Sequence, residues 1–217
     1  MLQILLMFSN NKTRSEQLAS LAFHWKMEFL EKDDTSLLPM LEHFKLFNRG
    51  GAKKLENIMF EMDEWMEEKI YIFDYRYTIS TGKSSHTFKQ NVFFVSSKHL
   101  GIPSFRMQPE NILHKIGSLL GMQDIDFETF PIFSKQYLLQ AEEEDIVRSF
   151  FGENLLHFFS DKKSWHLEAV GYYFILYFQN KQLAPSELAD LRQTGMSLLK
   201  MFKDNTFDIT LVTVPEE

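Results

Sequence analysis

The sequence predicts an α+β fold in which helices pack on a mainly antiparallel sheet around a phenylalanine-rich core. Strand-like segments follow one another through short turns, which is typical of hairpins, and strands do not alternate strictly with helices as they do in parallel sheets. Several helical stripes of apolar residues lie between the groups of strands. The 217 residues also include 22 phenylalanines, each of which buries a large area when it is packed.

The first hundred residues are expected to form helices followed by an antiparallel meander. Thr13 and Glu16 have the spacing of a capping box, which predicts that a helix begins there. Gly50 and Gly51 mark a turn before the long strands. The other elements expected in this half are a short strand (26–34), a short helix (35–44), two strands joined near residues 63–68 (54–80) and a returning strand (86–97).

The second half mixes strands with helices. Pro109 and Glu110 predict the start of a helix that ends at Gly121. The acidic residues 142–145 predict another helix start, because carboxylates stabilise the positive end of the helix dipole, and Gly152 predicts a break in that helix. The other elements expected here are strands (102–107 and 133–141), a hairpin (164–178), a helix from Pro185 and a tail strand (207–214).

Length and composition are those of an ordinary globular chain. Hydrophobic residues make up 44% and charged residues 24% of the sequence. The length fits one compact domain over residues 1–217, or two closely packed halves. In the second case the meander-rich half covers residues 1–100 and the mixed helix and strand half covers residues 101–217.

Charge and cysteine content disfavour several classes of partner and site. A net charge of −7 repels nucleic acid and anionic membranes, so we expect neither as a partner, and a protein partner remains open. The absence of cysteine rules out disulfides and thiolate metal sites. The apolar start, "MLQILLMF", is too short to span a bilayer, so we expect no transmembrane span. The expected location is cytoplasmic, or membrane-associated on the cytoplasmic side.

One predicted strand, "IYIFDYRYTIS", carries charges in its middle. Because alternate strand residues share a face, Tyr71, Phe73 and Tyr75 belong to an aromatic face that we expect to be core. Asp74 and Arg76 lie on the opposite face, about 7 Å apart along the strand. They form either an ion pair on a solvated face or, if another element covers that face, a buried structural pair or part of a pocket.

No complete catalytic or metal-binding motif is found. The acidic row Asp124, Asp126 and Glu128 lacks the spacing of a calcium loop and is interpreted as a solvated face. The stretch "TGKSS" lacks the first glycine of a phosphate loop, and no Gly-x-Ser-x-Gly sequence is present. We therefore expect no metal, no cofactor and no catalytic residues, and enzyme activity is left uncertain, with the absence of a motif favouring a protein that is not an enzyme.

Five short motifs resemble an uncharacterised bacterial family of soluble α+β domains. They are "FDYRYT", "QPE", "DIDF", "FSKQYLL" and "VRSFF", in this order, and the likeness covers roughly residues 20–200. Members of that family often carry this region behind N-terminal hydrophobic helices. The resemblance implies a bacterial source and an α+β fold, and it implies no activity, because none of the motifs is catalytic.

These observations favour a non-catalytic binding or interaction module. The alternative is a small-ligand or lipid carrier, or an enzyme, whose site is assembled from residues far apart in the sequence. Four polar residues are the candidates for ligand binding in that case: Asp74, Arg76, Glu110 and His166. A closed pocket that holds two or more of them favours the carrier or the enzyme, whereas an exposed apolar patch favours the interaction module.

Overall fold

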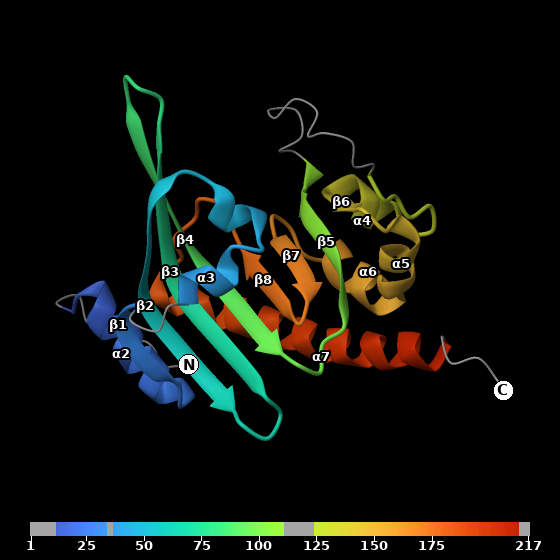
Figure 1. Cartoon of the computed structure of the whole chain (residues 1–217), viewed down its shortest axis with the longest axis horizontal. Coiled ribbons are helices and arrows are strands. Elements are labelled where there is room, and N and C mark those ends of the chain that lie inside the picture. The colour runs from blue at the N-terminus through green and yellow to red at the C-terminus, as the bar shows by residue number, and fades with distance from the viewer. Residues whose placement is uncertain (1–11, 34–36, 111–123, 213–217) are drawn as a thin grey trace.

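The computed structural model describes residues 12–33, 37–110 and 124–212, with side chains through residue 206. Within these residues the chain forms an eight-stranded antiparallel sheet in the order β1-β2-β3-β4-β8-β7-β5-β6 (Figure 1). The strands are β1 (Glu28–Lys32), β2 (Gly51–Asp63), β3 (Glu68–Ser80), β4 (Ser85–Ser97), β5 (Ile102–Pro109), β6 (Tyr137–Ala141), β7 (His166–Gly171) and β8 (Tyr173–Tyr177). The predicted α+β class with an antiparallel sheet is confirmed.

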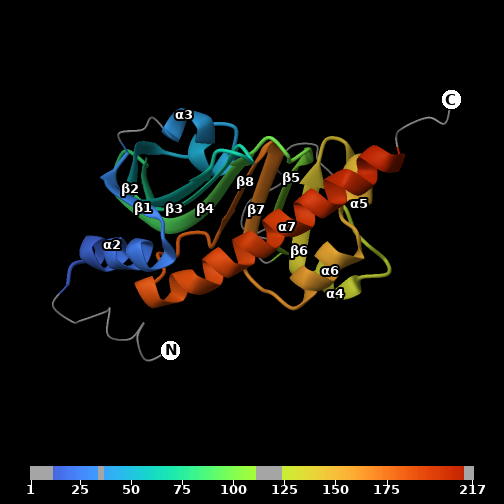
Figure 2. The ribbon, with the colours of Figure 1, turned by 90° about the horizontal axis from the view of Figure 1, so that it is seen from below.

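Helices cover both faces of the sheet unequally. Figure 2 shows α2 and the long α7 on one face, and α3 on the other. The helical elements are α2 (Arg14–Trp25), α3 (Leu37–Leu41), η1 (Lys45–Asn48), α4 (Pro131–Gln136), α5 (Glu144–Phe150), α6 (Glu153–Ser160), η3 (Pro185–Glu187) and α7 (Leu188–Val212). Since α3 and η1 are short, they cover only part of their face.

The larger core lies between the sheet and α2, α5, α6 and α7. It includes the Ile70 and Ile72 side of β3, together with Leu18 and Leu21 of α2. Helix α7 comes so close to β4 that a Cβ on Gly195 would lie 2.4 Å from the ring of Phe93. A glycine at this point therefore lets the helix rest directly on the buried ring.

A second, aromatic core lies under α3 and η1. It contains the β3 residues Tyr71, Phe73, Tyr75 and Tyr77, all of which are buried. The ring of Phe47 in η1 packs against Tyr75 with the centroids 4.4 Å apart. The aromatic face predicted from the alternation of β3 is therefore confirmed as core, and the phenylalanine-rich interior is confirmed with it.

Most predicted elements are present. Thr13 and Glu16 form the expected capping box at the start of α2. Gly152 caps the start of α6 and separates it from α5. The strands on either side of residues 63–68, the returning strand and the hairpin of β7 and β8 all form as predicted.

One predicted strand is wrong in its first half, since residues 137–141 form β6 but 133–136 do not, and the described part of the predicted tail strand is helical. Residues 133–136 belong to helix α4, which Pro131 begins and whose Phe133 packs at 5.7 Å between ring centroids from both Phe127 and Tyr137. Burial of that ring outweighs the weak local preference for a strand. Residues 207–212 continue helix α7, because extending an existing helix costs much less than starting a new element. The helix predicted to end at Gly121 lies mostly outside the described residues.

Candidate functional site

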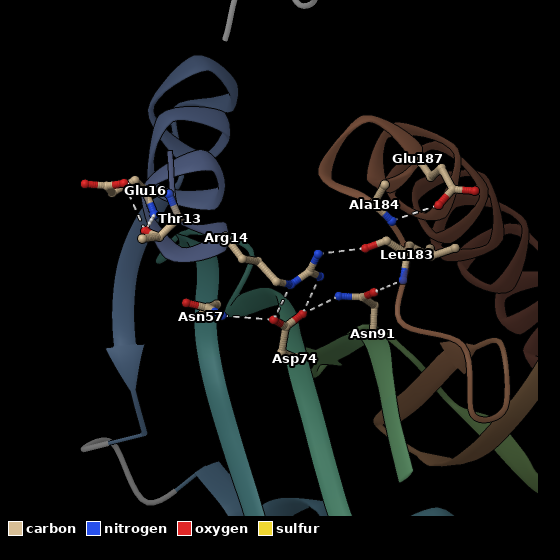
Figure 3. A network of polar contacts seen from close by, with 9 residues as sticks. All are labelled: Thr13, Arg14, Glu16, Asn57, Asp74, Asn91, Leu183, Ala184 and Glu187. Carbon is tan, nitrogen blue, oxygen red and sulfur yellow. Dashed lines mark hydrogen bonds and ion pairs between the residues drawn. The ribbon is translucent and has the colours of Figure 1, made fainter. Parts of the chain in front are cut away.

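Asp74 is buried, and its partner is an arginine far away in the sequence. Its carboxylate accepts hydrogen bonds from Arg14 Nε at 2.7 Å and Arg14 Nη2 at 2.8 Å (Figure 3). It also accepts from the side-chain amides of Asn57 and Asn91. Asp74 is only 5% exposed. The expectation that it pairs with Arg76 on a solvated face is therefore wrong, because α2 places Arg14 over this part of β3.

Local backbone features bring these partners together. The register of β2 shifts between Glu56 and Met59, and Asn57 within this bulge has a φ of 53°. Asparagine tolerates this left-handed conformation better than most residues do. Asn91 also accepts from the backbone N–H of Leu183 at 2.7 Å, and Arg14 Nη1 donates to the Leu183 carbonyl at 2.8 Å. The network therefore fastens α2 and the segment before η3 to the sheet.

Arg76 has a different partner, Glu56, on the neighbouring strand. Its Nη2 donates to Glu56 Oε1 at 2.9 Å, and both side chains are 36% exposed. Asp74 and Arg76 do line the same small, polar hollow of about 250 Å³, with Arg14, Asn57 and Lys89 among its other walls. Because the four donors on Asp74 already occupy its carboxylate, this hollow has the character of a structural network with a solvated ion pair beside it.

A second polar cluster lies on the part of the sheet that α3 and η1 leave uncovered. Buried Glu168 on β7 accepts from the backbone N–H groups of Lys45 and Leu46 and from the Tyr177 hydroxyl. Arg106 Nε, on the adjacent strand β5, lies 4.0 Å from Glu168 Oε1. Glu168 thus anchors the start of η1 to the sheet and fixes one wall of the space beside it.

Several buried polar atoms on β5, directly after it and on β7 have no hydrogen-bond partner within the described part of the chain. Arg106 and Gln108 alternate along β5 and therefore share a face, and Glu110 follows directly after the strand. The unpartnered atoms are Arg106 Nε, Gln108 Oε1, Glu110 Oε2 and, on β7, His166 Nδ1. Such atoms are few in folded proteins, and a local group of them indicates a place where a ligand or water completes the hydrogen bonding.

Arg106 and Glu168 line a hollow with a volume of about 490 Å³, within the range of small-ligand sites, whereas Gln108, Glu110 and His166 do not line it. Charged and apolar side chains both face it. Its walls are His43, Phe44, Lys45, Ser104, Phe105, Arg106, Gln140, Ala141, Glu142, Glu168, Ala169 and Val170. Strands β5, β6 and β7 form its floor, and the segment leading into η1 forms its side. We refer to this space as the β5–β7 hollow.

His166 lies beside this hollow as a neutral side chain. Its ring stacks on Tyr177 with the centroids 5.0 Å apart. Burial, together with the positive charges of Arg106 and Arg49, lowers the pKa of His166 from 6.5 to about 3. The imidazole therefore offers a neutral hydrogen-bonding group at physiological pH.

This pKa predicts an acid-dependent loss of stability. Between pH 6.5 and pH 3 the unfolded chain protonates His166 and the folded chain does not, so the unfolded state binds more protons and acid favours it. The quantity to compare is the free energy of unfolding of wild type minus that of a His166→Gln variant. This difference should fall by up to about 1.4 kcal/mol for each pH unit between pH 6.5 and pH 3. Urea unfolding of both proteins at several pH values measures it. A difference that does not change with pH would contradict the buried neutral histidine.

The acidic row does not gather into a metal site. Asp124 accepts a hydrogen bond from the Leu139 N–H, and burial is the main cause that raises its pKa to about 6. The charges of Asp126 and Glu110 raise that pKa further, while both Asp126 and Glu128 are exposed. Among the described residues, no group of three or more histidine, cysteine or acidic side chains is placed to hold a metal ion.

Comparison with known proteins identifies a related fold. No family model and no curated protein sequence matches the chain. The crystal structure of the mycobacterial trehalose monomycolate transport factor A, TtfA, superimposes with a TM-score of 0.59. The alignment covers 88% of this chain and 93% of that chain, at 11% sequence identity. The chain has a TtfA-like fold.

At this level of identity the likeness concerns the fold only. The motif resemblance to a bacterial family therefore stays a prediction. Of the helices within the described part of the chain, none is both long enough and apolar enough to cross a membrane.

None of the four candidate residues named from sequence lines the β5–β7 hollow. His166 and Glu110 each have a buried atom without a partner among the described residues, whereas Asp74 and Arg76 line the other hollow. Arg106 and Gln108 were missed, although a signal was present. In "FRMQPE" the polar residues alternate with Phe105 and Met107, which predicts one polar and one apolar strand face.

Proposed function

We propose that this chain is a non-catalytic binding module that takes a small amphiphilic ligand in the β5–β7 hollow. One observation carries the proposal. The same hollow combines apolar walls, such as Phe44 and Val170, with Arg106 and Glu168, and the Nε atom of Arg106 is a buried polar atom that lacks a partner among the described residues. A ligand with an apolar part and a hydrogen-bonding head group matches both kinds of wall.

The polar groups of the hollow are suited to binding more than to proton transfer. His166 stays neutral well below physiological pH, because its pKa is lowered to about 3. The Glu168 carboxylate is occupied by two backbone N–H groups and the Tyr177 hydroxyl. Catalytic acids and bases need a pKa near the working pH and a free path to the substrate; the pKa of His166 is too low, and the Glu168 carboxylate has no free path.

The comparison supports an amphiphile among the possible ligands. The neighbour with the same fold is named as a transport factor for trehalose monomycolate. We infer from the mixed walls of the hollow, together with this shared fold, that a lipid-like or other amphiphilic small ligand is the best candidate for this chain. The carrier alternative recognised from sequence is thus the form of binding module that we favour.

A fluorescent amphiphile tests the proposal. Anilinonaphthalene sulfonate should bind the wild-type protein, and a Ser104→Trp variant should bind it about tenfold more weakly, because the indole fills the hollow. Ser104 is an exposed strand residue, so the substitution leaves the core intact. Ser85→Trp is the matched control, since Ser85 is also an exposed strand residue but does not line the hollow.

Competition then defines the head group. Octyl glucoside, dodecylphosphocholine and laurate each have an apolar chain, but their head groups are neutral, zwitterionic and anionic. The concentration of each that displaces the dye shows which head group the site binds most tightly. Near-ultraviolet circular dichroism must show that each variant keeps its tertiary packing. Equal dye binding by wild type and Ser104→Trp, or failure of all three amphiphiles to displace the dye, would contradict an amphiphile site in this hollow.

A further inference from the structure

The turn between β2 and β3 exposes large apolar side chains at the end of the sheet. Trp65 is 96% exposed, and Met62 and Met66 beside it are exposed as well. Tyr172, in the turn between β7 and β8, is another exposed aromatic residue. Figure 1 shows the β2–β3 turn at the end of two long strands, beyond the elements that cover the faces of the sheet. Clustered exposed apolar side chains of this kind mark interaction sites.

The fold holds this turn in a defined shape. Asp63 Oδ1 accepts a hydrogen bond from the Met66 N–H at 3.0 Å, which closes the turn. Glu67 has a φ of 44° and forms an ion pair of 2.8 Å with Lys98 at the end of β4. Trp65 is therefore presented to solvent on a structured support, which reduces the entropy that a partner must remove on binding.

A hollow of about 690 Å³ lies beside the turn. Its walls are Met62, Asp63, Glu64, Glu67, Glu68, Lys69, Ser96, Lys98, Tyr172 and Tyr173. None of these residues lines the β5–β7 hollow, so the two spaces can be tested separately. We call this hollow together with Trp65 and Met66 the hairpin surface.

The charge of the hairpin surface is negative. Four carboxylates and two lysines line the hollow, and one of those lysines, Lys98, already pairs with Glu67. Glu68 Oε2 forms an ion pair with Lys203 Nζ of α7 at 2.5 Å. Asp63 and Glu64, which are exposed, precede Trp65 in the same turn. This surface attracts a cationic group and repels an anionic lipid surface.

We propose that the hairpin surface is a docking site for a protein segment that carries a lysine or arginine beside a large apolar side chain. The apolar side chain packs against Trp65 and Met62, and the cation meets Glu64 or lies over the indole ring. Tryptophan is a frequent centre of interface binding energy, and a cation over its face adds to the attraction. This docking site is separate from the amphiphile site in the β5–β7 hollow, because the two hollows share no lining residue.

Selection from a phage-displayed library of random peptides tests the proposal on the full chain. Peptides that combine lysine or arginine with an aromatic or large aliphatic residue should be enriched. The best of them, synthesised with a fluorophore, should bind a Trp65→Ser variant at least about tenfold more weakly than wild type by fluorescence anisotropy. A Glu64→Lys variant should weaken binding as well, and the affinity for wild type should fall as salt is added.

Phe23→Ser is the matched control, because Phe23 is an exposed aromatic residue on α2 that does not line the hairpin surface. It should leave peptide affinity unchanged. Enrichment of acidic or uncharged peptides, no enrichment, or equal binding by wild type and Trp65→Ser would overturn the proposal. Trp65-dependent sedimentation with phosphatidylcholine vesicles would overturn it in favour of a membrane surface.

Discussion

Replacing Phe73 with alanine is expected to lower the free energy of unfolding by about 3–5 kcal/mol. Phe73 is fully buried in the aromatic core under α3 and η1, where its ring lies 6.3 Å from that of Phe47 between centroids. Loss of the ring removes buried apolar area and leaves a cavity that the neighbouring strands are too rigid to close. Urea or thermal unfolding, followed by circular dichroism, measures the change.

Ile79→Ala is the matched control for this prediction. Ile79 lies on the same face of the same strand, but it is 38% exposed near the end of β3. We expect its replacement to cost less than about 1.5 kcal/mol, because little buried area is lost. Equal small losses for both variants would show that α3 and η1 do not enclose a packed aromatic core.

Replacing Asp74 with asparagine is expected to cost about 3 kcal/mol of stability. The substitution removes the charge that Arg14 contacts through two nitrogens, and it leaves the guanidinium partly buried without a counter-charge. The Arg14 side chain is 26% exposed, so water can partly solvate its charge once the carboxylate is gone. We therefore place the loss of stability at the lower end of the range for buried pairs. Urea unfolding at neutral pH gives the value.

Glu56→Gln is the control for Asp74→Asn, since Glu56 also accepts from an arginine and is the cross-strand neighbour of Asp74. Both side chains of its ion pair are 36% exposed, so we expect a loss below about 1 kcal/mol. A double variant with Arg14→Gln and Asp74→Asn should lose less than the sum of the two single variants, because neither group is then left unpaired. Strict additivity would show that Arg14 and Asp74 are not coupled.

The sequence predicted those parts of the fold that depend on near neighbours. The long hairpins follow from alternation over β3 and β4, and α2 follows from the capping box at Thr13. The partner of Asp74 could not be predicted in the same way. Arg14 reaches it only because α2 packs across β2, and no local pattern specifies that packing. The strand wrongly expected at residues 133–136 failed for the same reason, since tertiary burial of Phe133 decides its helix.

The candidate site shows a similar division. His166 stands out in sequence as an isolated polar residue, and the structure places it on β7, two residues from Glu168, with a buried ring nitrogen that lacks a partner among the described residues. The anchoring role of Glu168 could not be foreseen, because its donors are backbone N–H groups of η1, and any residue type supplies those. The hollow itself exists because η1 is short, and the extent to which a helix covers a sheet face cannot be derived from periodicity.

The strand order has a consequence for the chain as it leaves the ribosome. Strands β2, β3 and β4 pair with their neighbours in sequence and can assemble early. The other edge of β4 pairs with β8, for example Val92 with Tyr177, and this pairing has to wait until β8 is made. Until β8 is synthesised, β4 exposes the edge of the apolar run Val92–Val95. Unpaired edges of this composition recruit other nascent chains. Synthesis rate and chaperone contact before residue 173 should therefore govern the yield of folded protein more strongly than the stability of the finished sheet.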